Sequence, residues 1–273
     1  MVGCITDFAL LSLVPMEINN WQWRYAYQSY YEAARPVTAD NHYLPASPDI
    51  SFSRNTLRFF EKPAGKPLVI FFGGAMDSSN LNMKQVADGY HDKSKSGEFP
   101  VFDQDKLYFG QGDAEEAKIA ILEKVKSDPQ TVIALIGHSW GGDTAYKIVR
   151  DLAAHGLEIN LLVTLDPVSV GSYFKSQFVK PSGTTNWINF HVPKSDLASL
   201  GGHWGEQNDA FDVYLPDLTH IDAPRMFAKI SDQMRIFEAC SGQPNRTTEM
   251  QQKWESYYNE LKKPSNLPNK KKR

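Results

Sequence analysis

A short glycine-rich motif places a serine where a nucleophile could act. Residues 137–142 read Gly-His-Ser-Trp-Gly-Gly, with Ser139 between an apolar run and a helical pattern. A hydroxyl on such a sharp strand-to-helix turn points out of the sheet, and the crowded backbone needs small residues two positions before and after it. Gly137 and Gly141 occupy those positions. The motif therefore predicts a nucleophilic serine rather than one that only caps the helix.

The elements around this motif alternate between strands and helices. Three apolar runs, residues 68–72, 131–136 and 161–165, are continuous in the way of parallel strands buried on both faces. Weaker strands are expected at 106–109 and 187–192, and apolar residues recur at helical spacing between and after the runs. The pattern predicts an α/β fold with a mostly parallel central sheet and helices on both faces.

The chain is expected to form one domain, because no Pro/Gly/Ser-rich linker divides its 273 residues. Within a single domain of residues 1–261 we distinguish an aromatic-rich N-terminal extension (1–66, with one strand over 50–60), a catalytic core (67–240) and a C-terminal helix (241–261). Residues 262–273 form a basic tail.

Charge is distributed unevenly along the chain. The formal net charge is −3, and the last 12 residues carry six positive charges, so residues 1–261 carry −9. An acidic body offers no basic field, and nucleic acid is not an expected partner. The tail is expected either to be a solvated end or to attract anionic lipid headgroups, at about 1 kcal/mol per charge near a membrane surface.

Cysteines and apolar segments give little evidence of targeting. Cys4 and Cys240 are too few and too far apart to predict a disulfide framework or a zinc site. The apolar stretch 9–14 is too short for a membrane span and lacks a preceding positive region. We therefore expect no signal peptide or transmembrane segment, and a protein that is cytoplasmic or exported by another route.

The motif residues resemble those of a known superfamily. Over roughly residues 65–240, the Ser139 motif, the upstream Phe-Phe-Gly-Gly at 71–74 and the chain order Ser, Asp, His are similar to the α/β-hydrolase superfamily. His138 and the segment 162–168 (Leu-Val-Thr-Leu-Asp-Pro-Val) resemble lipases that include GPI-inositol deacylases and lipase effectors of bacterial type VI secretion.

The resemblance implies the α/β-hydrolase fold and hydrolysis of carboxylic esters through an acyl-enzyme, without a cofactor or a metal ion. A lipase or phospholipase is the favoured activity, in one form a secreted antibacterial effector with an inhibitory partner protein. The alternatives are a soluble esterase or thioesterase for small acyl substrates and a catalytically inactive hydrolase-fold protein that binds a partner.

A serine nucleophile needs a histidine to take its proton. In the α/β-hydrolase fold the base lies in the loops after the last strand, where His203 and His220 occur. His220 precedes a helix predicted from Ala223 and is the favoured base. His203 is the alternative, and otherwise a loop residue beside the substrate.

The histidine in turn needs a carboxylate to orient it. Asp166 follows the buried run 161–165, and Asp196 follows the next strand. Some members of the superfamily have the acid after the first of these strands, and others have it after the next strand. We favour Asp166, because it ends a strongly apolar strand at the carboxyl edge of the sheet.

The superfamily also suggests which groups would bind the substrate. Two N–H groups form an oxyanion hole, one from the residue after the nucleophile, Trp140, and one from the loop after the first strong strand, at Gly74 or Ala75. His138, His203 and Trp204 are the expected substrate-binding side chains. Residues 201–215 are either a lid over an acyl pocket or a surface excursion.

Overall fold

A computed structural model gives the fold. It describes residues 16–18, 51–52, 57–59, 68–75, 77, 82–96, 105–169, 178–193, 202, 204, 205, 207, 209–230 and 248–263. Most of the predicted N-terminal extension and the tail after residue 263 lie outside the described residues.

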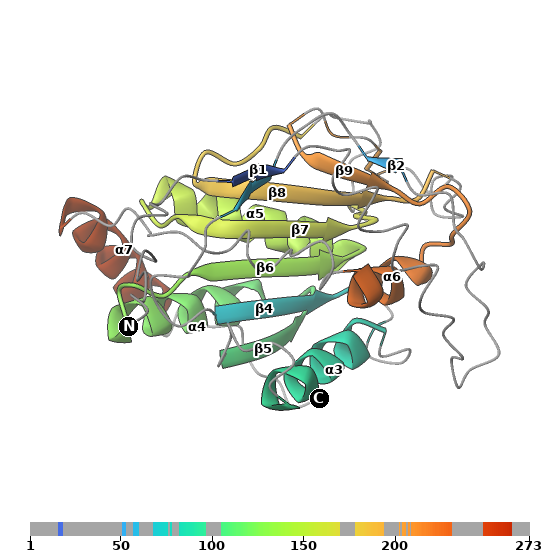
Figure 1. Cartoon of the computed structure of the whole chain (residues 1–273). Helices are drawn as coiled ribbons and strands as arrows, with labels where there is room; N and C mark the ends of the chain where they lie inside the picture. The colour runs from blue at the N-terminus through green and yellow to red at the C-terminus, as the bar shows by residue number, and fades with distance from the viewer. Residues whose placement is uncertain are drawn as a thin grey trace, which may run out of the picture.

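A seven-stranded sheet forms the centre of the molecule, with the strand order β2-β9-β8-β7-β6-β4-β5 (Figure 1). Its strands are β2 (Ser51–Phe52), β4 (Leu68–Gly73), β5 (Asp105–Gly110), β6 (Ile133–His138), β7 (Ile159–Leu165), β8 (Thr184–His191) and β9 (Phe211–Tyr214). In this sheet the six neighbouring strands β9, β8, β7, β6, β4 and β5 are parallel, and β2 pairs antiparallel with β9.

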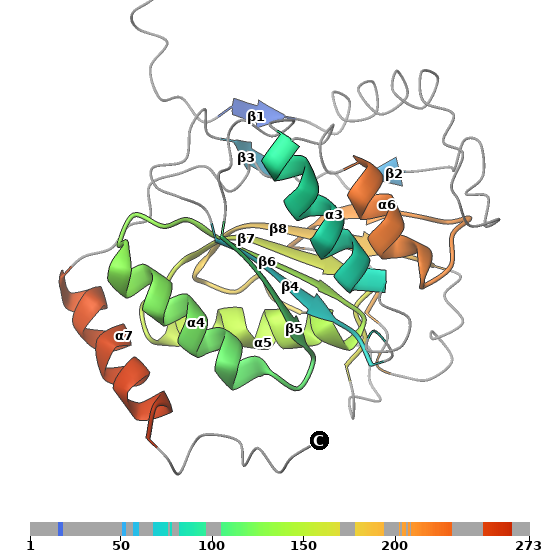
Figure 2. The same ribbon diagram turned by 90° about the horizontal axis from the view of Figure 1, so that it is seen from below.

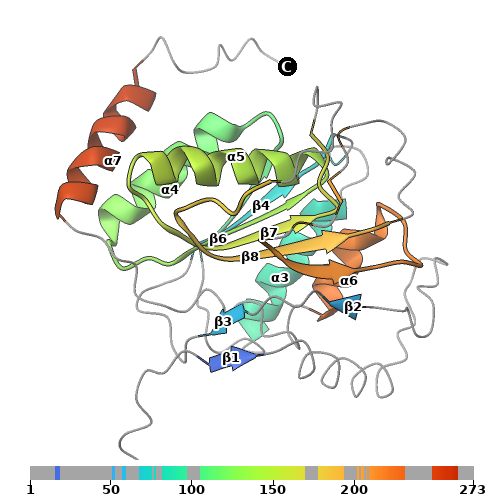
Figure 3. The same ribbon diagram turned by 90° about the horizontal axis from the view of Figure 1, so that it is seen from above.

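Helices cover both faces of this sheet. Figures 2 and 3 show α3 (Asn82–Ser96) and α6 (Asp222–Ile230) on one face, and α4 (Ala114–Ser127) and α5 (Trp140–Ala154) on the other. The C-terminal helix α7 (Thr248–Leu261) packs against the outside of α4. The predicted parallel sheet between two helical layers is confirmed.

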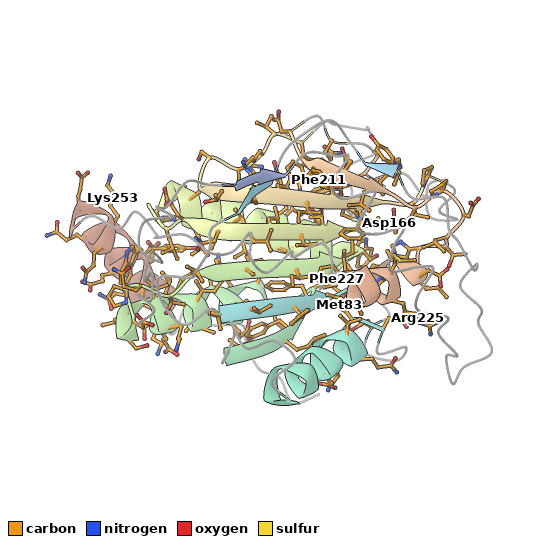
Figure 4. All side chains as sticks on the ribbon, in the orientation of Figure 1. Met83, Asp166, Phe211, Arg225, Phe227 and Lys253 are labelled. Atoms are coloured by element: carbon orange, nitrogen blue, oxygen red, sulfur yellow. The ribbon has the colours of Figure 1, made fainter. Side chains whose placement is uncertain are left out.

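Two hydrophobic clusters, one on each face of the sheet, explain the continuous apolar runs. Adjacent residues of a strand point to opposite faces. Phe71 accordingly packs with Met83 of α3 and Phe227 of α6, whereas Phe72 packs in the cluster that contains Ile121 of α4. Figure 4 shows Met83 and Phe227 on the two helices of the first layer. A strand between two helical layers is therefore apolar at nearly every position.

The strand β9 corrects the interpretation of residues 201–215, at least for residues 211–214. Phe211 and Val213 are buried in the cluster on the α3 and α6 face, and Asp212 on the opposite face is fully buried too. Asn189 of β8 donates through Nδ2 to the Asp212 carboxylate at 2.6 Å. This bond lets an acidic residue occupy a buried strand, so the segment is neither a lid nor a surface excursion there.

The N-terminal strand prediction is also corrected. Instead of one strand over 50–60, the structure has two short strands, β2 in the central sheet and β3 (Leu57–Phe59) paired antiparallel with β1 (Met16–Ile18). The polar residues 53–56, Ser-Arg-Asn-Thr, interrupt the apolar pattern between them.

A partly buried ionic cluster attaches the C-terminal helix. Lys118 of α4 lies 2.6 Å from the Asp151 carboxylate of α5, and its Nζ donates to the Tyr257 hydroxyl of α7 at 2.8 Å. Of the predicted helix 241–261, the structure describes the part from Thr248 onward. Within the described parts of the chain, no helix has the length and apolar character needed to cross a membrane.

Candidate active site

Ser139 lies on a strained turn between β6 and α5. Its φ of 57° and ψ of −126° place it in the left-handed half of backbone space, which non-glycine residues rarely adopt. Its N–H donates to the carbonyl of Leu165 in the neighbouring strand β7 at 3.0 Å, and this bond holds the turn against the sheet. Strain of this kind persists only where the surrounding structure imposes it, and it is frequent at functional sites.

The glycines of the motif allow the strand, the turn and the helix to approach closely. A Cβ atom at Gly137 would collide with the backbone of Gly141, and one at Gly141 would collide with the carbonyl of Phe72 in β4. Larger residues at either position would push α5 away from the strands. The predicted need for small residues on both sides of Ser139 thus has a direct steric cause.

This strained turn follows β6, in the middle of six parallel strands, and leads directly into α5. A strained turn at the carboxyl end of a central parallel strand, leading directly into a helix, is characteristic of the α/β-hydrolase fold, in which it is called the nucleophile elbow. The chain has the α/β-hydrolase fold. Asp166 and His220 lie at the same edge of this α/β-hydrolase sheet, after β7 and β9 respectively.

Asp166 and His220 meet although 54 residues separate them. The Nδ1 atom of His220 lies 2.6 Å from Oδ2 of Asp166, whose side chain is completely buried. The other carboxylate oxygen accepts the N–H of Val192, just after β8, at 3.1 Å. Figure 4 shows Asp166 at the carboxyl end of β7. A carboxylate on Nδ1 leaves Nε2 of the imidazole to exchange a proton with another group.

The rival residues His203 and Asp196 lie outside the described residues. The structure brings together Asp166 and His220, the acid and the base that the sequence favoured. Their catalytic role stays a prediction.

The loop after β4 lies against Ser139. A Cβ atom at Gly74 would lie 2.7 Å from the Cβ of Ser139 and 3.3 Å from its Oγ, so only glycine allows this approach. Gly74 is buried and Ala75 is exposed. Trp140 begins α5, whose N-terminal N–H groups and positive dipole end are adjacent to Ser139. Both predicted sources of oxyanion donors are thus next to the serine.

Asp77 and Tyr108, which the sequence analysis did not identify, brace this loop. Asp77 accepts the N–H groups of Met83 and Lys84 at 2.7 and 3.2 Å, and the hydroxyl of Tyr108 at 2.5 Å. Burial and the Asp77 carboxylate raise the pKa of Tyr108, which keeps its hydroxyl protonated as a donor. The sequence signal was an aspartate shortly before a helix, a position where its oxygens can bind free helical N–H groups.

His138 and Trp204, two of the predicted substrate-binding side chains, are buried and contact protein groups. His138 is 5% exposed, and its Nε2 lies 3.0 Å from the backbone oxygen of His220. Trp204 is 2% exposed, stacks on Phe178 and donates through Nε1 to Ser169 at 2.7 Å. The substrate contact predicted for Trp204 has no support in the structure, which places this side chain in the core.

Burial of His138 predicts a loss of stability in acid. Burial, and secondarily the neighbouring His220, lower the pKa of His138 from 6.5 to about 3. Between these values the unfolded chain binds a proton that the folded chain does not, so the free energy of unfolding falls by about 1.4 kcal/mol for each pH unit of acidification. Above pH 6.5 both states are neutral at this residue and the contribution is constant.

Denaturant titrations at pH 5.5, 5.0 and 4.5 measure this dependence. His138→Phe should reduce the slope of unfolding free energy against pH by about 1.4 kcal/mol per unit relative to the unsubstituted protein. Equal slopes in the two proteins would show that His138 titrates normally in the folded state.

Several solved structures are similar to the chain. The peroxisomal α/β-hydrolase Lpx1 of Saccharomyces cerevisiae is 12% identical, with a TM-score of 0.42 over 83% of this chain and 95% of that one. XC6422 of Xanthomonas campestris, an α/β serine hydrolase without a lid, is 15% identical, with a TM-score of 0.38 over 72% and 98%. Phospholipase PlaB of Legionella pneumophila is 12% identical, with a TM-score of 0.41 over 72% and 62%. No protein-family model matches the chain, and no curated protein does.

Proposed function

We propose that the protein is a serine hydrolase that cleaves carboxylic esters through an acyl-enzyme. The observation that carries this proposal is the bond of 2.6 Å between His220 and Asp166 beside the strained turn at Ser139. A histidine oriented by a buried carboxylate next to an elbow serine is the arrangement that activates a hydroxyl for attack.

Each group has one role in the proposed reaction. The Oγ of Ser139 attacks the ester carbonyl carbon while Nε2 of His220 takes its proton, and Asp166 stabilises the imidazolium that forms. The N–H groups of Trp140 and of Gly74 or Ala75 bind the oxygen that becomes negative. His220 then gives its proton to the departing alcohol. Water, activated by the same histidine, releases the acid and restores Ser139.

Labelling with a fluorophosphonate tests the chemical step without knowledge of the substrate. The protein is expected to lose one equivalent of reactive serine, with the phosphonate attached to Ser139 in a peptide map. Absence of labelling in folded protein would instead favour a hydrolase-fold protein that only binds a partner. Labelling at another serine would show that this other serine, and not Ser139, is the nucleophile.

Lipid acyl esters are the substrate class that we propose. The support is the resemblance of residues 137–142 and 162–168 to lipases and the six positive charges of residues 262–273. Turnover of anionic phospholipid vesicles is expected to exceed turnover of short p-nitrophenyl esters, and deletion of residues 270–273 should weaken vesicle binding without affecting the soluble ester. Faster turnover of the short esters, with vesicle binding unchanged by the deletion, would favour a small-ester esterase.

The proposed acid can be tested with one isosteric change. Asp166→Asn keeps the shape of the side chain but replaces an acceptor with an amide that can hold the imidazole in the wrong tautomer, so turnover should fall by about 10⁴-fold. Asp196→Asn serves as the comparison and should have little effect on turnover. If the two variants exchange these results, the acid comes from the segment after β8.

A further inference from the structure

His138 and His220 form a direct contact between the elbow and the loop that carries the proposed base. Their ring centroids are 4.4 Å apart with the planes tilted by 33°, and Nε2 of His138 lies 3.0 Å from the backbone oxygen of His220. A carbonyl oxygen can only accept, so Nε2 of His138 carries the hydrogen and donates it. The contact joins residues 82 apart in the sequence.

His220 needs this anchor because it lies on a loop rather than on a regular element. The loop runs from the end of β9 at Tyr214 to the start of α6 at Asp222. Its first residue, Leu215, donates its N–H to His191 of β8 at 2.9 Å, whereas the backbone bonds nearer His220 are local, such as Asp222 N–H to Thr219. The bond to Asp166 holds only the end of the His220 side chain. The bond from His138 holds the backbone of His220. Together the two bonds fix both ends of the His220 side chain.

The charge state of His138 suits this role. The titratable groups that act on His138 are His220, whose ring it contacts, and Asp166, which lies on Nδ1 of His220. Burial holds the pKa of His138 at about 3, so the ring remains a neutral donor at neutral pH. A neutral ring packed against His220 adds no positive charge next to the imidazolium that forms during the reaction.

We propose that His138 is a positioning residue that fixes the backbone and ring plane of His220, and thereby the direction of its Nε2 toward Ser139. The proposal rests on the proposed function, in which His220 is the base. It gives the residue before the nucleophile a part in the chemical step without contact with the substrate.

Three substitutions of His138 distinguish the effect of its hydrogen bond from the effect of its ring packing. His138→Gln keeps an N–H donor at a reach similar to Nε2, His138→Asn has a donor about one bond length too short, and His138→Phe keeps a ring without a donor. The matched control is His155→Phe, because His155 also contacts a backbone oxygen, that of Asp151 at 2.8 Å, and stacks on Tyr257, but it lies at the far end of α5.

We expect kcat on a soluble p-nitrophenyl ester to fall about 100-fold in His138→Phe and His138→Asn, with KM unchanged, because a small misplacement of a catalytic group has effects of this size. The rate constant of fluorophosphonate labelling should fall equally. His138→Gln should retain kcat within about tenfold, and His155→Phe should be fully active. Melting curves accompany every variant.

The outcomes distinguish this inference from the proposed function. Unsubstituted protein that is not labelled by the fluorophosphonate would overturn the proposed function. Labelling of that protein together with equal kcat in His138→Phe, or equal loss in the Gln and Asn variants, would overturn the positioning role alone. If His138→Phe does not fold, the comparison of Gln with Asn decides, since these two amides differ by one methylene group.

Discussion

Ser139→Ala is expected to lower ester turnover by about 10⁶-fold, the loss typical of a serine hydrolase without its nucleophile. Alanine keeps the Cβ atom, so the backbone strain at φ 57° is the same and the fold should be retained. Hydrolysis of a p-nitrophenyl ester and covalent labelling by a fluorophosphonate measure the loss, and both should disappear together.

Ser127→Ala is the control for this variant. Ser127 ends α4 and its hydroxyl donates to the carbonyl of Lys124 at an exposed position, so the same atom is removed far from the site. Its turnover should equal that of the unsubstituted protein. Substantial turnover by Ser139→Ala, with a normal melting curve, would show that the elbow serine is not the nucleophile.

His220→Ala is expected to reduce turnover about as severely as Ser139→Ala. Residues that act as one unit lose most of their effect when any essential member is removed, so the double variant should be no slower than either single one. The measurement is kcat of the two single variants and the double variant on the same soluble ester.

His203→Ala provides the contrast, because His203 was the alternative base in the sequence analysis. We expect this variant to change KM more than kcat. If His203→Ala were inactive and His220→Ala active, His203 would be the base. The bond between His220 and Asp166 would then have no part in catalysis.

Local sequence patterns were sufficient to predict those elements whose structure depends on residues close together in the chain. The apolar runs predicted β4, β6 and β7, because a strand between two helical layers is apolar at nearly every residue. The elbow was predictable for a similar reason, since its steric crowding restricts positions only two residues from Ser139. Even so, β9 was missed, because Asp212 breaks the apolar pattern and its partner Asn189 comes from another strand.

The sequence by itself determined the fold class, the place of the elbow and the candidates for base and acid, since each follows from periodicity or from short spacing. Only the tertiary structure decided which side chains meet: His220 with Asp166, His138 with His220, and Tyr108 with Asp77. These pairs are separated by 54, 82 and 31 residues. Contacts at such separations depend on how the strands order themselves in the sheet and how the loops close over its edge, and no local pattern of residue types carries that information.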